Sequence, residues 1–380
     1  MLNFNYRNAT RVLFGRDEHR HIGPELKKLG FGKVLIVYGG GSAIKNGTIA
    51  AVQESLEAVG IEYFTMGGVR PNPQLSFAQK VKEVAVHSEV DCLVAVGGGS
   101  VIDTCKAAAA AACYVGDPWD FFTKGVAIEK ALPVATVLTI PAAGSEQSVR
   151  MVINHQSLKL GTASEAIRPV LSVVNPELFY SLPKFQIAAG VVDMISHIFE
   201  RYFTNTPAVD YVSAQSEAAI RTAMTFGLKL MENPEDYDAW CQVAMVGSWA
   251  HNGYFGLGRV EDWACHAIEH ELSAYDPTIA HGAALAVLTP HWMRYVADVN
   301  PERMLAFARN IMGVPTAEAG IEALEAFYAK LEMPKKLSEF GLTEKALEVC
   351  ARSACARTGS VGNFKKLTSE DVLAIYKSAF

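Results

Sequence analysis

The sequence predicts two domains of different architecture, an α/β domain over residues 1–183 and an all-helical domain over residues 184–380. Its 380 residues exceed the size at which a single hydrophobic core stops growing. From about residue 10 to residue 175, short apolar runs alternate with helical ones. After SLPKF (181–185), the apolar spacing is helical almost throughout. Continuous apolar strands separated by helices are typical of a parallel sheet that is covered on both faces.

Four apolar runs in the first half are predicted to be strands of this sheet. They are KVLIVY (33–38), DCLVAVGGGS (91–100), LPVATVLTIP (132–141) and PVLSVVN (169–175). Helical patterns follow the first two runs, over residues 43–58 and 101–115. This order of elements predicts a parallel sheet, but the sequence has no G-x-G-x-x-G at these turns, so an ordinary Rossmann fingerprint is not claimed.

The second half is predicted to contain only helices, because apolar residues recur there with the period of an α-helix. Asn-Pro, Asp-Pro and glycine interrupt the pattern. The predicted helices cover residues 186–203, 207–231, 236–254, 263–274, 282–297, 301–312 and 317–330. No long linker separates the two halves, so we expect a cleft between them.

Length and composition favour a cytoplasmic enzyme. Half of the residues are hydrophobic and 19% are charged, and a net charge of −6 argues against binding to nucleic acid. No stretch approaches the ~18 uninterrupted apolar residues of a membrane span, and the N-terminus lacks the pattern of a signal peptide. The seven cysteines are odd in number and scattered, which predicts reduced thiols.

Two glycine-containing turns predict a binding site for a dinucleotide. Gly97, Gly98, Gly99 and Ser100 end a buried strand and open a helix, where backbone amides and the helix dipole favour a pyrophosphate. Asp103 lies in the first turns of that helix, where it contacts the nucleotide or simply complements the helix dipole. The second turn, PAAGSEQS (141–148), is a tight structural turn or a source of hydroxyl donors to a phosphate or a nicotinamide. These hydroxyls belong to Thr139, Ser145 and Ser148.

The turn after the first predicted strand favours NADP(H) over NAD(H). An acidic residue at this place would bind a ribose 2′-hydroxyl and repel a 2′-phosphate. The sequence instead has Gly39, Gly40 and Gly41, followed by Ser42 and Lys45. Small residues with a hydroxyl and an ammonium group suit a 2′-phosphate. The alternative is that Lys45 is an ordinary solvated lysine.

Five residues of the helical half predict a divalent metal site. Asp193 and His197 lie four residues apart, as do His266 and His270, and His281 follows. Residues with this spacing share one face of a helix. A carboxylate with several imidazoles suits Fe²⁺, Zn²⁺, Co²⁺ or Ni²⁺. One such pair would more often be a capping or surface interaction, but two pairs and a further histidine favour a metal.

In this order, the motifs resemble those of the iron-containing (group III) alcohol dehydrogenases, in the branch of butanol dehydrogenases and NADPH-dependent aldehyde reductases. The resemblance covers nearly the whole chain. It rests on NFNYRNATRVLFG (3–15), VYGGGSAIKNG (37–47), GGVRPNP (67–73), VAVGGGSVIDTCK (94–106), LTIPAAGSE (138–146), GVVDMISHIFE (190–200) and DWACHAIEHELSAYDPTIAHG (262–282).

The resemblance implies a Rossmann-like dinucleotide-binding domain and an all-α C-terminal domain of the dehydroquinate synthase-like fold. It implies Asp193, His197, His266 and His281 as metal ligands, with Fe²⁺ the expected metal and Zn²⁺ or Ni²⁺ as alternatives. His270 matches a histidine beside the nicotinamide and the substrate, where it is a catalytic acid or base. A homodimer is also implied.

The sequence departs from the family pattern at two places. Between His270 and His281 there is one residue more than the branch usually has, and Ala143 stands where relatives often have threonine. The other histidines have no motif support. Among these, His251 is the best outside candidate for the site.

The expected reaction is hydride transfer between NADP(H) and a small aldehyde or primary alcohol. Sibling activities on the same scaffold are glycerol dehydrogenation and a dehydroquinate synthase-like cyclisation. The latter needs a cluster of Lys and Arg for a substrate phosphate, whereas the histidine segments here are flanked by Tyr254, Phe255, Trp263 and Tyr275. A metal-dependent hydrolase and a metal-stabilised binding protein are the remaining alternatives.

Overall fold

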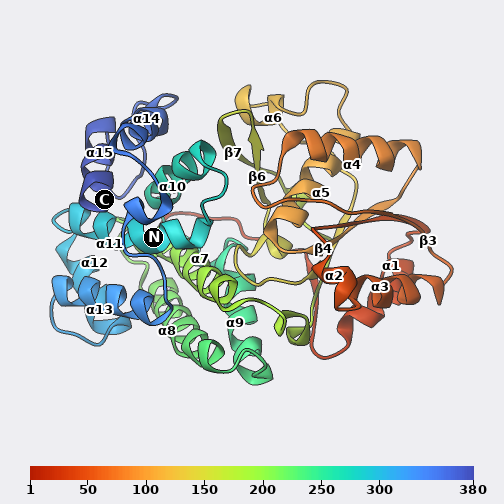
Figure 1. Ribbon diagram of the computed structural model, residues 1–380, viewed down its shortest axis with the longest axis horizontal. Helices are drawn as coiled ribbons and strands as arrows, with labels where there is room; N and C mark the ends of the chain where they lie inside the picture. Colours follow the sequence, from red (N-terminus) through yellow and green to blue (C-terminus); the bar gives the residue numbers. More distant parts are fainter. The chain divides into compact units, whose positions relative to one another are not determined.

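The computed structural model describes residues 1–380, which divide into two compact units. The α/β unit is Arg7–Leu182, and the helical unit is Pro183–Phe380 together with Met1–Tyr6. The predicted fold class, a parallel α/β domain followed by an all-helical one, is confirmed (Figure 1).

The α/β unit is built on one six-stranded sheet in which every neighbouring pair is parallel, in the order β1-β8-β5-β4-β2-β3. The four predicted strands form its centre, and their side chains are almost all buried. The sequence did not indicate the edge strands β1 and β3, because both are short and none of their residues is fully buried. The strands are β1 (Arg11–Phe14), β2 (Lys33–Tyr38), β3 (Glu62–Met66), β4 (Cys92–Gly97), β5 (Val134–Leu138) and β8 (Leu171–Val174).

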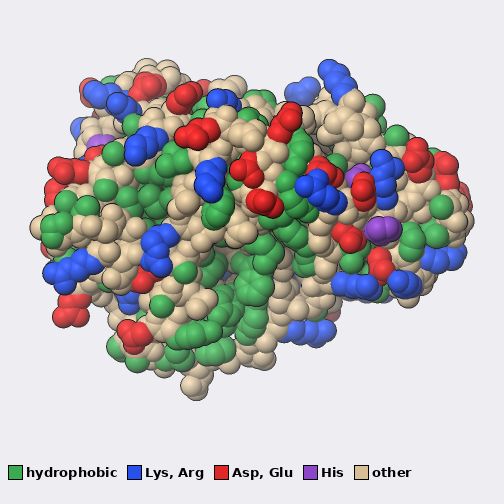
Figure 2. All heavy atoms as spheres, turned by 90° about the horizontal axis from the view of Figure 1, so that it is seen from below, with side chains coloured by type: hydrophobic (Ala, Val, Ile, Leu, Met, Phe, Trp, Pro, Cys, Tyr) green, Lys and Arg blue, Asp and Glu red, His purple; other side chains and the backbone are tan.

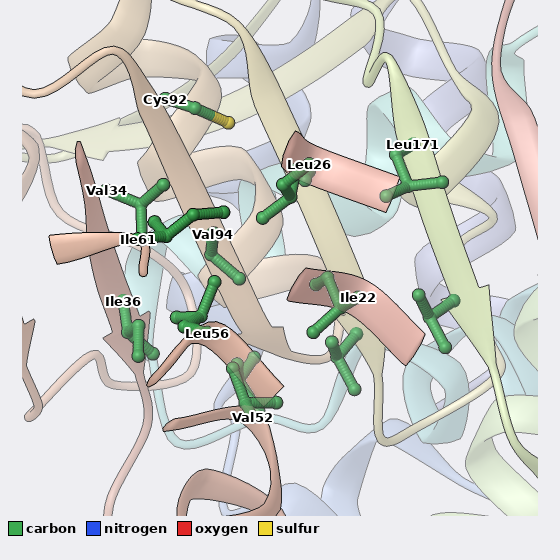
Figure 3. Close-up of a cluster of buried hydrophobic side chains, with 14 of the residues drawn as sticks. Ile22, Leu26, Val34, Ile36, Val52, Leu56, Ile61, Cys92, Val94 and Leu171 are labelled. Atoms are coloured by element: carbon green, nitrogen blue, oxygen red, sulfur yellow. The ribbon is translucent and has the colours of Figure 1, made fainter. Parts of the chain in front are cut away.

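Helices cover both faces of this sheet. On one face, Ile22 and Leu26 of α1 pack with Val52 and Leu56 of α3 against alternate residues of the strands (Figure 3). On the other face, α5 packs on β4 and β5 and is itself covered by α4. The helices are α1 (Ile22–Lys28), α2 (Ser42–Lys45), α3 (Thr48–Glu57), α4 (Leu75–His87), α5 (Gly99–Ala112) and α6 (Asp120–Thr123).

Two features of the α/β unit differ from the prediction. The helix expected over residues 43–58 is broken at Gly47, whose φ of +81° lies in the left-handed region. The sequence pattern also missed an antiparallel hairpin of β6 (Arg150–His155) and β7 (Leu158–Ala163). The hairpin was missed because polar and charged residues interrupt both of its strands.

In the helical unit, all seven predicted segments are helical, and α7 lies at the centre against α8, α9 and α11. Nearly every residue of α7 from Ile187 onward is buried. The C-terminal helices α14 and α15 were not predicted. The helices are α7 (Lys184–Tyr202), α8 (Asp210–Glu232), α9 (Tyr237–Ala250), α10 (Ala264–Tyr275), α11 (His281–Val296), α12 (Pro301–Ala306) with a π-helical turn (Phe307–Ile311), α13 (Ala317–Lys330), α14 (Glu344–Cys355) and α15 (Ser369–Ser378).

The face of the molecule drawn in Figure 2 carries charges of both signs. On the face shown in Figure 2, basic and acidic side chains are interspersed, with no continuous basic area. None of the helices combines the length and the apolar character needed to cross a bilayer.

Candidate metal centre and nucleotide-binding turns

Three helices of the helical unit bring a carboxylate and two imidazoles to one point. Ligand atoms of Asp193 on α7, His266 on α10 and His281 on α11 lie within 4.8 Å of one another. The Oδ1 atom of Asp193 is 3.8 Å from Nε2 of His266 and 3.6 Å from Nε2 of His281. The two Nε2 atoms thus face a common oxygen. These three residues could therefore hold one metal ion.

The local sequence explains how α11 comes close enough to α7. His281 is the first residue of α11, and Gly282 follows it. A Cβ atom on Gly282 would lie 2.1 Å from the carbonyl oxygen of Ala189 in α7, so only glycine permits this approach. His281 therefore reaches Asp193 across a close contact between the two helix backbones.

The start of α10 is held by Asp262. Its carboxylate accepts hydrogen bonds from the backbone N–H groups of Ala264, at 3.3 Å, and of Phe364, at 2.6 Å. Burial raises the pKa of Asp262 to about 7, and the charge of Glu200 adds to this effect. Trp263 follows with a φ of +66°, a conformation that is strained for a residue other than glycine. These contacts fix the direction in which α10 presents His266.

Electrostatics at the centre fit a divalent cation. Nε2 of His266 is buried and has no hydrogen-bond partner, which costs on the order of 1–3 kcal/mol. Oδ1 of Asp193 is also buried and makes no hydrogen bond, although Nδ1 of His197 lies 3.0 Å from it. Burial alone would raise the pKa of Asp193, but the neighbouring histidines hold that pKa well below its usual range. Burial alone would lower the pKa of His266, but Asp193 and Glu200 raise it to about 9. A metal bound between these atoms would displace the proton of His266 and would satisfy both groups.

His197 lies beside this group but is not one of the three residues whose ligand atoms converge. Its ring centroid is 4.4 Å from that of His266, and its Nδ1 atom is 3.0 Å from Oδ1 of Asp193. The same Nδ1 atom lies 2.9 Å from the backbone oxygen of Asp193. His251 packs against His197, with ring centroids 4.4 Å apart. The buried guanidinium of Arg201 lies 3.3 Å from Nδ1 of His251.

His270 is half-buried at the side of the centre. Its ring centroid is 5.5 Å from that of His281 and 6.4 Å from that of His266. Glu269, His270 and His281 form a second set of ligand atoms within 4.8 Å of one another. His270 therefore lies next to the converging atoms of Asp193, His266 and His281 without belonging to that group.

The four aromatic residues that flank the histidine segments have different surroundings. Trp263 packs against the rings of His197, His251 and His266. In contrast, Tyr254 packs with Phe255, Tyr6 and Trp249, and Tyr275 is exposed.

Two buried glutamates that the sequence did not single out accept hydrogen bonds from the Nδ1 atoms of His266 and His281. Oε1 of Glu200 accepts hydrogen bonds from the backbone N–H and from Nδ1 of His266, both at 2.7 Å. Oε2 of Glu269 accepts a hydrogen bond from Nδ1 of His281. Glu200 lies two helical turns after Asp193, and Glu269 lies one turn after His266. This helical spacing could have suggested both.

The three turns predicted to bind the nucleotide follow the carboxyl ends of adjacent strands in the α/β unit. Gly39 follows β2, Gly98 follows β4 and Thr139 follows β5, and these three strands are neighbours. A Cβ atom on Gly98 would lie 3.2 Å from Ile140, and one on Gly99 would lie 3.3 Å from Ala143. In open α/β sheets, ligands bind at this edge.

The side chains of these turns differ in how freely they face solvent. Gly40 and Gly41 have open space where a Cβ atom would lie, and Ser42 and Lys45 are exposed. Ser100 is half-buried in the first turn of α5, and Thr139 is also half-buried. These groups are accessible to a ligand.

Three other predicted side chains are already engaged within the protein. Asp103 accepts hydrogen bonds from Oγ of Ser145 at 2.6 Å and from the backbone of Val152 at 2.8 Å. Oγ of Ser148 accepts one from the backbone of Arg150. A contact between these three side chains and a nucleotide therefore remains a prediction, and it would have to share or replace these bonds.

Lys106 connects α5 to residues 145–150 through hydrogen bonds. Its position in the sequence did not reveal this role. Its side chain is fully buried. Nζ donates to the carbonyl oxygens of Ser145 (2.7 Å), Ser148 (2.9 Å) and Arg150 (2.9 Å), and to Oγ of Ser145. Burial lowers the pKa of Lys106 to about 8, although Asp103 opposes this effect. The ammonium group thereby joins α5 to the turn at residues 145–148.

Comparison with known proteins gives matches over almost the whole chain. A model described as "Iron-containing alcohol dehydrogenase" matches residues 9–176, and one described as "Fe-containing alcohol dehydrogenase family, C-terminal" matches residues 187–380. The NADH-dependent butanol dehydrogenase A of Clostridium acetobutylicum is 37% identical over 100% of both chains. The NADPH-dependent aldehyde reductase YqhD of Escherichia coli is 34% identical over 90% of each. The crystal structure of NADH-dependent butanol dehydrogenase A from Thermotoga maritima has a TM-score of 0.96 and 40% identity, covering 100% of this chain and 99% of its own.

Proposed function

The chain belongs to the iron-containing alcohol dehydrogenase family, and we propose that it transfers a hydride between NADP(H) and a small aldehyde or primary alcohol. Family membership makes it an NAD(P)-dependent oxidoreductase of alcohols or aldehydes with a metal and a nicotinamide cofactor. One observation of the structure carries the proposal. It is the convergence of Asp193, His266 and His281, in which the buried atoms Oδ1 of Asp193 and Nε2 of His266 make no hydrogen bond.

In this proposal, Asp193, His197, His266 and His281 hold the divalent metal, with Fe²⁺ preferred and Zn²⁺ or Ni²⁺ as alternatives. A metal bound there supplies Lewis-acid polarisation of the substrate carbonyl. The hydride step belongs to the nicotinamide, and the protein contributes position and exclusion of water. The Trp263 ring contributes to that exclusion, because it covers His197, His251 and His266.

The experiment that tests the proposed reaction is a steady-state assay of nicotinamide oxidation with butanal, run with NADPH and with NADH. We expect turnover with butanal and the reverse reaction with butanol. Absence of turnover with any aldehyde or alcohol would contradict the proposal. The alternatives of glycerol dehydrogenation, cyclisation and hydrolysis are not favoured, because the relatives named above are butanol dehydrogenases and an aldehyde reductase.

The preference for NADP(H) is a proposal of its own, since the named relatives include both NADH-dependent and NADPH-dependent proteins. It is supported by the open space at Gly40 and Gly41 and by the exposed hydroxyl and ammonium groups of Ser42 and Lys45. We expect Lys45→Ala to raise the KM for NADPH about tenfold or more, because a charge-assisted bond to a phosphate is lost.

Lys45→Ala should leave the KM for NADH within about twofold, because NADH lacks the 2′-phosphate that this bond needs. Lys28→Ala, on the exposed side of α1, is the matched control. An equal rise in the KM of both nucleotides, or no rise in either, would contradict the preference.

His270 is proposed to relay the alcohol proton, because it lies next to the metal-binding group and is half-buried. We expect His270→Ala to lower kcat by about a hundredfold and to remove one limb of the pH–rate profile. The bound metal should remain. Unchanged turnover and an unchanged pH profile would show that His270 has no such role.

We also propose that the protein is a cytoplasmic homodimer. The localisation rests on seven free cysteines, which suit a reducing compartment. The dimer rests on the resemblance to the family. Light scattering after size-exclusion chromatography should give twice the mass of one chain.

A further inference from the structure

The three histidines proposed as metal ligands all turn their Nδ1 atoms toward an oxygen of the protein. For His266 this oxygen belongs to Glu200, and for His281 it belongs to Glu269. For His197 it is the backbone carbonyl of Asp193, in the preceding turn of the same helix. A carbonyl or carboxylate oxygen can only accept, so each Nδ1 carries a hydrogen. Nε2 is then the nitrogen that remains for a metal to bind.

The two glutamates act across helices. Glu200 on α7 holds a histidine of α10, and Glu269 on α10 holds a histidine of α11. Each histidine of these two pairs is therefore held by a helix that comes earlier in the sequence. The hydrogen bond from His266 to Glu200 thus connects α10 to α7, and the one from His281 to Glu269 connects α11 to α10. Asp193, His266 and His281, whose ligand atoms converge, lie on these three helices.

Both carboxylates are shielded from water. Glu200 is 2% exposed and Glu269 is 0% exposed, and Asp193 is 6% exposed. Burying three carboxylates so close together is unfavourable unless positive charge lies near them. A divalent cation held by Asp193 and neutral imidazoles would supply that charge.

We propose that Glu200 and Glu269 are positioning residues that fix the orientation and the tautomer of His266 and His281, and so set the affinity of the centre for its metal. The inference rests on the metal ligands assigned under the proposed function. It goes beyond them because neither glutamate is a ligand in that assignment. Glu269 also belongs to the set of Glu269, His270 and His281, and a role as a direct ligand is the alternative that the experiment must separate.

The first test measures the tautomers in the wild-type protein. Long-range ¹H–¹⁵N NMR of the zinc-loaded protein with labelled histidine should show His266 and His281 protonated at Nδ1 and bound to zinc through Nε2. Zinc bound through Nδ1 of either histidine would overturn the proposal. This measurement needs no substitution, so it stands even if a variant does not fold.

The second test is a titration of metal-stripped protein with Co²⁺ in the presence of a competing chelator, on Glu200→Gln, Glu269→Gln and a control. Glutamine keeps the size of the side chain but removes its charge. The control is Glu217→Gln, because Glu217 is also a buried glutamate of the helical unit. It accepts hydrogen bonds from Tyr202 and Asn310 rather than from a histidine.

We expect each of the two positioning variants to raise the Kd for Co²⁺ by about ten- to a hundredfold and to keep the visible absorption bands of the saturated centre. Glu217→Gln should change the Kd by less than about twofold. Equal Kd values for all three variants would overturn the proposal. A changed absorption spectrum in Glu269→Gln would also overturn it, because that result would make Glu269 a ligand.

The possible results distinguish failure of the proposed function from failure of the positioning role of Glu200 and Glu269. If the wild-type protein binds no Co²⁺, or turns over equally well without metal, the proposed function fails. If the wild-type protein binds Co²⁺ and needs metal for turnover while both glutamate variants keep the wild-type Kd, only the positioning role fails.

Discussion

Replacing Asp193 with asparagine is expected to abolish stoichiometric metal binding and to lower turnover by about a thousandfold or more. Asp193 provides the only carboxylate oxygen that faces Nε2 of both His266 and His281. An amide keeps the shape but removes the negative charge that attracts a cation. Lewis-acid stabilisation amounts to several kcal/mol, and each 1.4 kcal/mol or so corresponds to a factor of ten in rate. Metal content by mass spectrometry and kcat with butanal would measure the two effects.

Asp210→Asn is the matched control for this substitution. Asp210 is exposed in the first turn of α8, so its loss should affect only a weak interaction with the helix dipole. We expect the control to keep its metal and its turnover. If Asp193→Asn kept both as well, the metal would have to be bound elsewhere.

Replacing Lys106 with methionine is expected to destabilise the α/β unit by about 3–5 kcal/mol. The substitution keeps an unbranched chain in the core but removes the donor to three carbonyl oxygens and the cation next to buried Asp103. For a unit of this size, the loss corresponds to a fall in Tm of roughly 6–20 °C. Calorimetry would follow the transition of this unit.

Two further variants test whether the fall in Tm comes from the loss of the buried charge of Lys106. Lys124→Met removes an exposed lysine that pairs with Asp120, and such an exposed pair contributes little to stability. Adding Asp103→Asn to Lys106→Met should recover part of the loss, because the buried carboxylate no longer lacks a counter-charge. A Tm for Lys106→Met equal to that of Lys124→Met would contradict the account of this network.

The sequence predicts the central elements of the fold better than the edges. Strands such as β4, with six buried residues in succession, have the continuous apolar pattern that is typical of a covered parallel sheet. The edge strands β1 and β3 each pair with one neighbour and have no fully buried residue, so they leave a weaker pattern. The break at Gly47 depends on one left-handed residue, which helical periodicity cannot reveal.

For the site, helical spacing predicts which residues share a face but not which helices meet. The convergence of Asp193, His266 and His281 depends on the close approach at Gly282, a contact between segments far apart in the sequence. The roles of Glu200, Glu269 and Lys106 are set by such contacts too. The sequence alone does not distinguish a buried charged residue from an exposed one, because burial of a charge depends on its partners in the fold.

The measurement that tests the central claim most directly is turnover of NADPH and butanal before and after removal of the metal. We predict that the chelator-treated protein still binds NADPH, which its fluorescence would show. Its turnover should fall to about a hundredth or less and return when Fe²⁺ or Zn²⁺ is added. Full turnover in protein that mass spectrometry shows to be free of metal would contradict the claim that Asp193, His197, His266 and His281 form a catalytic metal centre.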